Sequence, residues 1–141
     1  MNPLMKLGLN FHIRVFRWTS GRLLGQFGQG RILLLTTIGR KTGQPRTVPL
    51  MYIEDDRGNP VIAASFGGSP EPPIWFHNLT ANPEVTVETR GRTQKSRARI
   101  APPEERAKLW AKLVSMEKRF LGYEEKTRGK REIPMIVLEP I

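Results

Sequence analysis

The loop between residues 39 and 46 places three cationic side chains around two glycines. Arg40, Lys41 and Arg46 flank Gly39 and Gly43 in the sequence GRKTGQPR. Charged donors and exposed backbone N–H groups of this kind can converge on one anion, and phosphate suits them. The order of a Walker loop is absent, and the segment leads into a predicted strand rather than a helix. A solvated basic hairpin tip has the same composition, so both interpretations stay open from this loop alone.

A serine stands beside two glycines at the end of a later predicted strand. The sequence AASFGG (residues 63–68) superficially has the form of the hydrolase nucleophile elbow, with alanine in the first position. We reject a hydrolase, because that elbow belongs to a larger strand-to-helix architecture and nothing places His12 or His77 near Ser65. The glycines leave a bare backbone against which a planar ring can lie, with N–H groups free to bond a ring carbonyl. The segment therefore predicts a cofactor loop.

Other chemistry has little support in the residue inventory. The two histidines are far apart and lack a motif such as HExxH, so we predict no metal site. The absence of cysteine excludes disulfides, thiolate nucleophiles and cysteine zinc sites. The sequence has no pair of acidic residues in an apolar context, so it does not indicate general acid–base catalysis of glycoside hydrolysis. Any difficult chemistry is therefore expected to fall to a cofactor.

The elements that position these loops are mostly short strands. Alternating or apolar runs bounded by turn formers predict strands over residues 31–38, 46–53, 60–65, 85–90, 93–100 and 133–138. A short helix is expected over residues 74–79, and a longer one opens at Pro102 and Pro103. Its expected apolar stripe consists of Ala107, Trp110, Leu113 and Val114. Residues 118–131 are highly charged, and no regular element is assigned to them.

The order of these elements indicates the fold class. Short connections and the absence of a strand–helix–strand repeat predict a mainly β, mostly antiparallel small barrel with flanking helices. A length of 141 residues suits a single domain. Residues 1–20 are expected to form an amphipathic helix, and residues 21–141 the barrel domain.

Charge and composition limit the partners and the compartment. A net charge of +10 indicates an anionic partner, which a phosphorylated cofactor, a nucleic acid or an anionic lipid would satisfy. Because cysteine is absent and no secretory signal is visible, we expect a cytoplasmic protein. The basic amphipathic helix of residues 1–20 suits packing on its own domain, or peripheral contact with the inner face of the membrane.

Three segments together resemble one family. LLLTTIGRKTGQPRTVPL, AASFGGSPEPPIWFHNLTANPEV and REIPMIVLEP are similar, in order, to deazaflavin-dependent nitroreductases, which use reduced coenzyme F420 and include quinone-reducing members. The resemblance covers residues 20–141. It implies a split β-barrel and hydride transfer from the deazaflavin to a quinone, nitro compound or other electron-poor acceptor.

The resemblance also implies roles for particular residues. Ser65 and Tyr123 are the implied catalytic residues, and Tyr123 would either donate a hydrogen bond or proton to the reduced acceptor or shield the hydride from water. The implied cofactor-binding residues are Arg40, Lys41, Thr42, Gly43 and Arg46 for the phosphate and acidic tail, Ala64, Ser65, Phe66, Gly67 and Gly68 for the ring, and Trp75 and Asn78 beside the groove.

Several alternatives remain from the sequence. Related split barrels accept FMN, so an FMN-using oxidoreductase is the main rival, and a member that only stores its cofactor is another. A nucleic-acid-binding module is disfavoured, because the basic segment 90–99 has no interleaved aromatic residues for base stacking. The expected partner is therefore a small-molecule electron acceptor rather than a nucleic acid, and the oligomeric state stays open.

Overall fold

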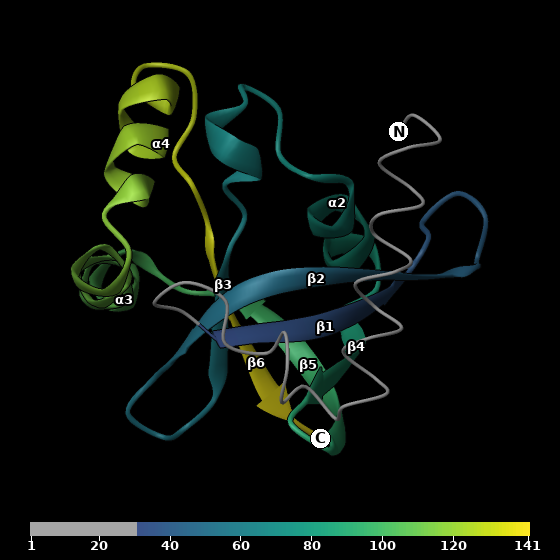
Figure 1. The fold of residues 1–141 in the computed structure, drawn as a ribbon. Coiled ribbons are helices and arrows are strands. Elements are labelled where there is room, and N and C mark those ends of the chain that lie inside the picture. The colour runs from purple at the N-terminus through teal and green to yellow at the C-terminus, as the bar shows by residue number, and fades with distance from the viewer. Residues whose placement is uncertain (1–30) are drawn as a thin grey trace.

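The computed structural model describes residues 31–141 (Figure 1). The helix expected over residues 1–20, and with it the question of membrane contact, lies outside the described residues. No helix within residues 31–141 has the length and apolarity required to cross a bilayer.

Six antiparallel strands close into a barrel in the order β1-β2-β3-β6-β5-β4, and β1 pairs with β4 to complete it. The strands are β1 (Arg31–Ile38), β2 (Pro45–Glu54), β3 (Pro60–Ala63), β4 (Glu84–Thr89), β5 (Arg92–Ile100) and β6 (Met135–Pro140). This barrel confirms the mainly β, antiparallel fold expected from the sequence.

Two hydrophobic clusters hold the elements together, and alternate residues of the same strands supply both. Ile62 of β3 and Ile136 of β6 belong to the first cluster, with residues of β1, β4 and α2. Their sequence neighbours Val61 and Val137 belong to the second cluster, with residues of α3 and α4. Because successive strand side chains point to opposite faces, β3 and β6 are apolar on both sides.

Within residues 31–141, three helices and one short turn cover this framework (Figure 1). They are the 3₁₀ turn η1 (Phe66–Gly68), α2 (Ile74–Ala81), α3 (Pro103–Met116) and α4 (Arg119–Thr127). The expected stripe on α3 is wrong in part, because Ala107 is exposed and Leu109 is buried in its place. Helix α4 was not predicted, and β3 ends at Ala63 rather than Ser65. The buried side chains of α4, Phe120 and Thr127, are seven residues apart, which is a helical spacing, but the charged residues around them mask it in the sequence.

A carboxylate–guanidinium network fastens α3 to the barrel and makes stability depend on pH. Arg99 of β5 donates two hydrogen bonds of 2.7 Å to Glu105 of α3, and its Nε donates to Glu139 Oε1 of β6 at 3.0 Å. These hydrogen bonds, with the charge of Arg99, hold the pKa of Glu105 below its ordinary value. A carboxyl group with a depressed folded-state pKa stabilises the protein above its unfolded pKa, and this stability is lost as the pH falls through the folded value.

We therefore expect Glu105→Gln to lower the free energy of unfolding by about 1 kcal/mol at neutral pH. The difference from wild type should shrink as the pH falls below about 4.3, the ordinary pKa of glutamate. Urea unfolding at several pH values measures both quantities. Glu125→Gln is the matched control, because the Glu125–Arg128 pair lies on the exposed face of α4 at 3.4 Å. A Glu105→Gln deficit that persists unchanged at low pH would contradict this account.

Candidate active site

The basic loop is the tip of the β1–β2 hairpin, and its backbone is closed by its own hydrogen bonds. Gly39 N donates to Gln44 O and Gly43 N donates to Gly39 O, both at 2.8 Å. Gly43 has φ +71°, a conformation that side chains disfavour, and Gly39 has no room for a Cβ atom because Thr42 Oγ1 would lie 2.7 Å from it. The two glycines thus permit a tight tip.

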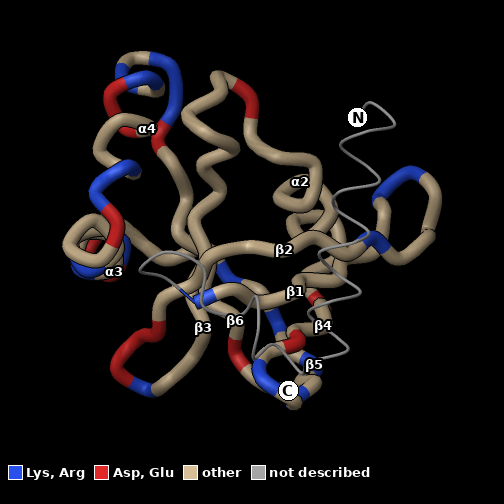
Figure 2. Tube along the Cα trace, viewed as in Figure 1, with Lys and Arg blue, Asp and Glu red and all other residues tan. Residues whose placement is uncertain are grey.

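The cations of this tip have no carboxylate partners. Arg40, Lys41 and Arg46 are exposed, and none of them forms an ion pair or a side-chain hydrogen bond with another residue of the described part of the chain. Figure 2 shows the same isolation, with blue segments at the hairpin tip and no red segment among them. Three charged donors remain available for an anion.

Asn78 fixes the base of this hairpin from α2. Its side chain is only 2% exposed, its Oδ1 accepts the backbone N–H of Arg40 at 3.1 Å, and its Nδ2 donates to Thr37 Oγ1 at 3.2 Å. Trp75 lies three residues earlier, so both side chains share one face of the helix. One face of α2 thus supports both the hairpin and the groove described next.

A groove of about 300 Å³ opens beside the barrel, between β2, η1 and α4. Its walls include residues 49–51 of β2, Trp75 of α2, residues 65–67, and Arg119, Phe120 and Tyr123 of α4. Phe120 and Tyr123 pack edge to face, with ring centroids 5.2 Å apart. Neither Ser65 Oγ nor Tyr123 Oη has a hydrogen-bond partner within residues 31–141, so both hydroxyl groups can serve a ligand.

The loop that borders the groove has three successive residues with positive φ. Phe66, Gly67 and Gly68 have φ of 45°, 64° and 84°, and Phe66 is 61% exposed. A Cβ atom on Gly68 would come within 3.1 Å of Lys126 Cβ and Tyr123 Cα, so this glycine allows α4 to pack against the loop. A Cβ atom on Gly67 would meet nothing within 4 Å, so open space lies over the backbone there.

Arg131 binds the backbone of this loop, and no pattern in the sequence predicts that role. Its Nη1, Nη2 and Nε donate to the carbonyl oxygens of Ala64 at 3.0 Å, Ser65 at 2.8 Å and Ser69 at 3.0 Å. Burial lowers the pKa of its guanidinium, while the charge of Glu71 opposes that shift. No local sequence pattern indicates such a contact, because the partners are more than 60 residues away.

The predicted site residues therefore form two groups joined by shared elements. Ser65, Phe66, Gly67, Trp75 and Tyr123 line the groove. The hairpin residues 40–46 and Asn78 lie outside its walls, whereas Ala64 and Gly68 are buried behind it. Strand β2 connects the groups, since Arg46 and Leu50 are four residues apart, or about 13 Å along a strand.

An antiparallel barrel with an open groove beside it, and with a hairpin whose cations are unpaired within residues 31–141, is an arrangement that suits a split-barrel protein with a phosphorylated cofactor. The chain belongs to the F420H(2)-dependent quinone reductase family, whose sequence model matches residues 9–140. It is an F420-dependent oxidoreductase of the kind expected from the sequence, and the FMN alternative finds no support.

Individual relatives agree with this assignment. An F420H(2)-dependent quinone reductase of Mycobacterium tuberculosis strain H37Rv is 37% identical over 135 residues, which cover 92% of this chain and 88% of the relative. The solved structure of an F420-H2 dependent reductase is 38% identical, with a TM-score of 0.69, and the match covers 77% of this chain and 93% of that one. A further solved structure, a domain-swapped dimer, is 30% identical, with a TM-score of 0.72 over 98% of this chain and 100% of that one.

Proposed function

We propose that the protein reduces a quinone-type acceptor with a hydride from reduced F420, and that the reaction takes place in the groove between β2, η1 and α4. The observation that carries this proposal is the physical connection between the groove and the unpaired cationic hairpin. Strand β2 provides residues to both, and one face of α2 supports both through Trp75 and Asn78. A ligand with a planar ring at one end and anionic groups at the other matches this arrangement.

The residues present fit such a cofactor. Arg40, Lys41 and Arg46, with the N–H groups around Thr42 and Gly43, would hold the phosphate and acidic tail. The bare backbone at Gly67, with open space above it, would accept the flat ring, and Trp75 would form a wall of that site. When bound, reduced F420 supplies a hydride, and one further proton completes the conversion of a quinone to a hydroquinone.

Two hydroxyl groups in the groove could assist that conversion. Ser65 and Tyr123 both line the groove, and the hydroxyl groups of both lack a partner in the described part of the chain. We assign to Tyr123 the hydrogen bond that a quinone oxygen accepts as it gains negative charge. The ring of Tyr123, packed on Phe120, would also exclude water from the site.

The experiment that tests this function mixes the purified protein with reduced F420 and a naphthoquinone, and follows the reappearance of oxidised F420 by its absorbance. Reduced FMN in place of F420 is the cofactor control. Turnover with F420 and not with FMN is the expected result. An absence of turnover despite tight F420 binding would instead identify a cofactor-storing protein.

For Tyr123→Phe we expect kcat to fall by about tenfold to a hundredfold, with little change in F420 affinity. The ring that packs on Phe120 is kept in this variant, so water exclusion is unchanged while the hydrogen bond is lost. Steady-state kinetics with a naphthoquinone and a separate F420 titration measure the two quantities. A wild-type kcat in this variant would leave Tyr123 with the shielding role alone.

A further inference from the structure

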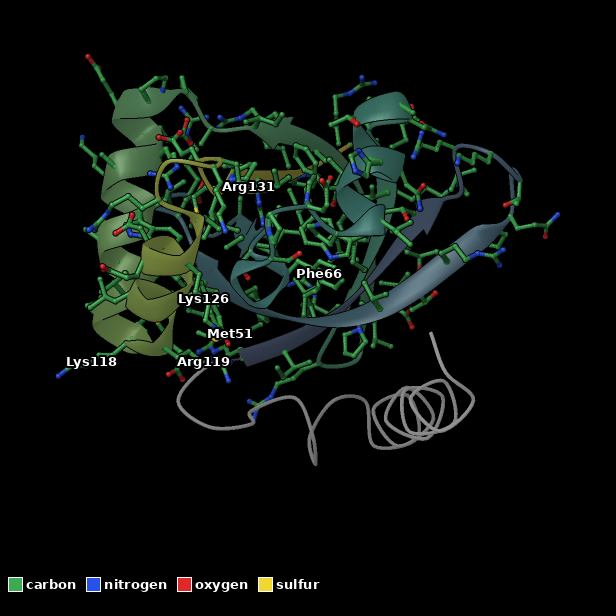
Figure 3. The ribbon with its side chains drawn as sticks, turned by 90° about the horizontal axis from the view of Figure 1, so that it is seen from above. Met51, Phe66, Lys118, Arg119, Lys126 and Arg131 are labelled. Carbon is green, nitrogen blue, oxygen red and sulfur yellow. The ribbon has the colours of Figure 1, made fainter. Side chains whose placement is uncertain are left out.

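One charged side chain lies in the wall of the groove. Among the groove-lining residues of the described chain, Arg119 alone carries a formal charge. It is the first residue of α4, and in Figure 3 it lies beside Met51 of β2. Because the other lining residues of that part of the chain are uncharged, Arg119 is the wall residue that can attract an anionic group of a ligand.

The protein itself supplies Arg119 with weak contacts only. Its Nη2 lies 3.6 Å from the thioether sulfur of Met51, and its guanidinium carbon is 5.7 Å from the ring centroid of Phe120. The nearest carboxylate, Glu117, is 3.9 Å from its Nε, which is beyond a hydrogen bond. A guanidinium has five N–H donors, and within residues 31–141 none of those on Arg119 meets an oxygen acceptor.

The neighbouring cations differ from Arg119 in this respect. Arg131 directs its donors to three backbone carbonyls, and the stem of Lys126 packs along Gly68. Lys118 precedes Arg119 but is not part of the groove, and in Figure 3 its amino group points away from the molecule. Arg119 is thus the cation that combines a place in the wall with available donors.

We propose that Arg119 is a specificity-determining residue that binds an anionic substituent, such as a carboxylate or sulfonate, on the acceptor. The inference rests on the proposed quinone reduction, and it adds the class of acceptor: quinones that carry a negative group beside the reacting ring. The proposed site for the tail of the cofactor is the hairpin at the other end of β2. Arg119 therefore stays available to bind the acceptor. The side chain is 54% exposed, which lets a charged substituent enter from solvent.

The test compares naphthoquinone sulfonate with unsubstituted naphthoquinone as acceptors, using kcat/KM with saturating reduced F420. For Arg119→Ala the ratio of the two kcat/KM values, sulfonate over unsubstituted, should fall by about tenfold relative to wild type. Because the ratio is compared between proteins, the different intrinsic reactivity of the two quinones cancels. Lys118→Ala removes the same charge one residue earlier and should keep the wild-type ratio. In wild type the ratio should decrease as salt is added, and in Arg119→Ala it should decrease less steeply, because only the general attraction of the net positive charge remains.

Three outcomes would overturn the inference. They are an unchanged ratio in Arg119→Ala, an equal fall in Lys118→Ala, and a weakened F420 affinity in Arg119→Ala that accounts for the whole effect. Circular dichroism and thermal melting establish that each variant is folded before the ratio is read. If wild type reduces neither quinone, the proposed function fails. If wild type reduces both and the ratio does not change in Arg119→Ala, the acceptor inference alone fails.

Discussion

Replacing Arg40, Lys41 and Arg46 together by alanine is expected to weaken F420 binding by at least about a hundredfold. Each hydrogen bond between a guanidinium or ammonium group and a phosphate oxygen is worth about 1.5 kcal/mol or more, and each tenfold in affinity corresponds to about 1.4 kcal/mol. These cations have no partner within residues 31–141, so their removal breaks no internal contact of that region and should not reduce stability. Titration followed by cofactor fluorescence measures the affinity.

The matched control removes three other exposed cations from the β4–β5 hairpin. Arg90, Arg92 and Lys95 are exposed and form no ion pair in the described part of the chain, so their triple alanine variant has the same net charge as the test variant. With a net charge of +10 in wild type, general attraction for an anionic cofactor is also expected. If both variants lose affinity equally, general attraction explains the binding and the hairpin site is wrong.

Strand β2 carries the hairpin at one end and contributes to the groove further along, and its packing fixes the distance between the two. In β2 the side chains of Val48 and Leu50 contact the barrel core, while Met51 contributes to the second cluster and to the groove. The strand is therefore held on both faces, and its register with β1 fixes the distance from Arg46 to the groove. In the proposed site, an anionic tail bound at the hairpin would therefore set how far a ring reaches along β2. A rigid element of this kind would orient the reactants before the reaction.

The barrel could be predicted from the sequence because its signals are local. Alternation and turn formers identify each strand, and the turn at residues 39–45 fixes the pairing of Arg31–Ile38 with its neighbour. The resemblance placed Trp75 and Asn78 beside the groove, and in the structure their separation of three residues puts both on one face of α2. The structure shows that Asn78 accepts a hydrogen bond from the backbone N–H of Arg40 and so supports the hairpin. The sequence alone does not indicate this contact.

The groove could not be assembled from the sequence, because it depends on contacts between distant segments. Helix α4 comes from a highly charged stretch, yet it supplies Arg119, Phe120 and Tyr123 to the wall. Its packing depends on Gly68, about 50 residues earlier, where a side chain would collide with Lys126 and Tyr123. Such complementarity between two surfaces has no signature in either segment alone.

Arg131 is the clearest case of a residue that only the structure shows, and its removal should have the second large effect. We expect Arg131→Ala to lower the free energy of unfolding by about 3 kcal/mol, since three charge-assisted hydrogen bonds to backbone carbonyls are lost. The residues it holds include Ser65 and border the ring site, so quinone turnover should fall by about tenfold as well. Thermal unfolding and steady-state kinetics, the latter at a temperature where the variant is folded, measure the two effects.

Arg131→Lys separates the charge of this side chain from its geometry. Lysine keeps the positive charge, but its single ammonium group cannot reach three carbonyls that a planar guanidinium addresses along three N–H directions. We therefore expect the lysine variant to recover only a minor part of the lost stability and turnover, while Arg128→Ala, which breaks the surface pair with Glu125, should resemble wild type. Full recovery by lysine would show that a positive charge beneath the loop is sufficient. A loss of stability with unaltered turnover would restrict Arg131 to a purely structural role, because the groove would then keep its shape without the hydrogen bonds that now hold its border.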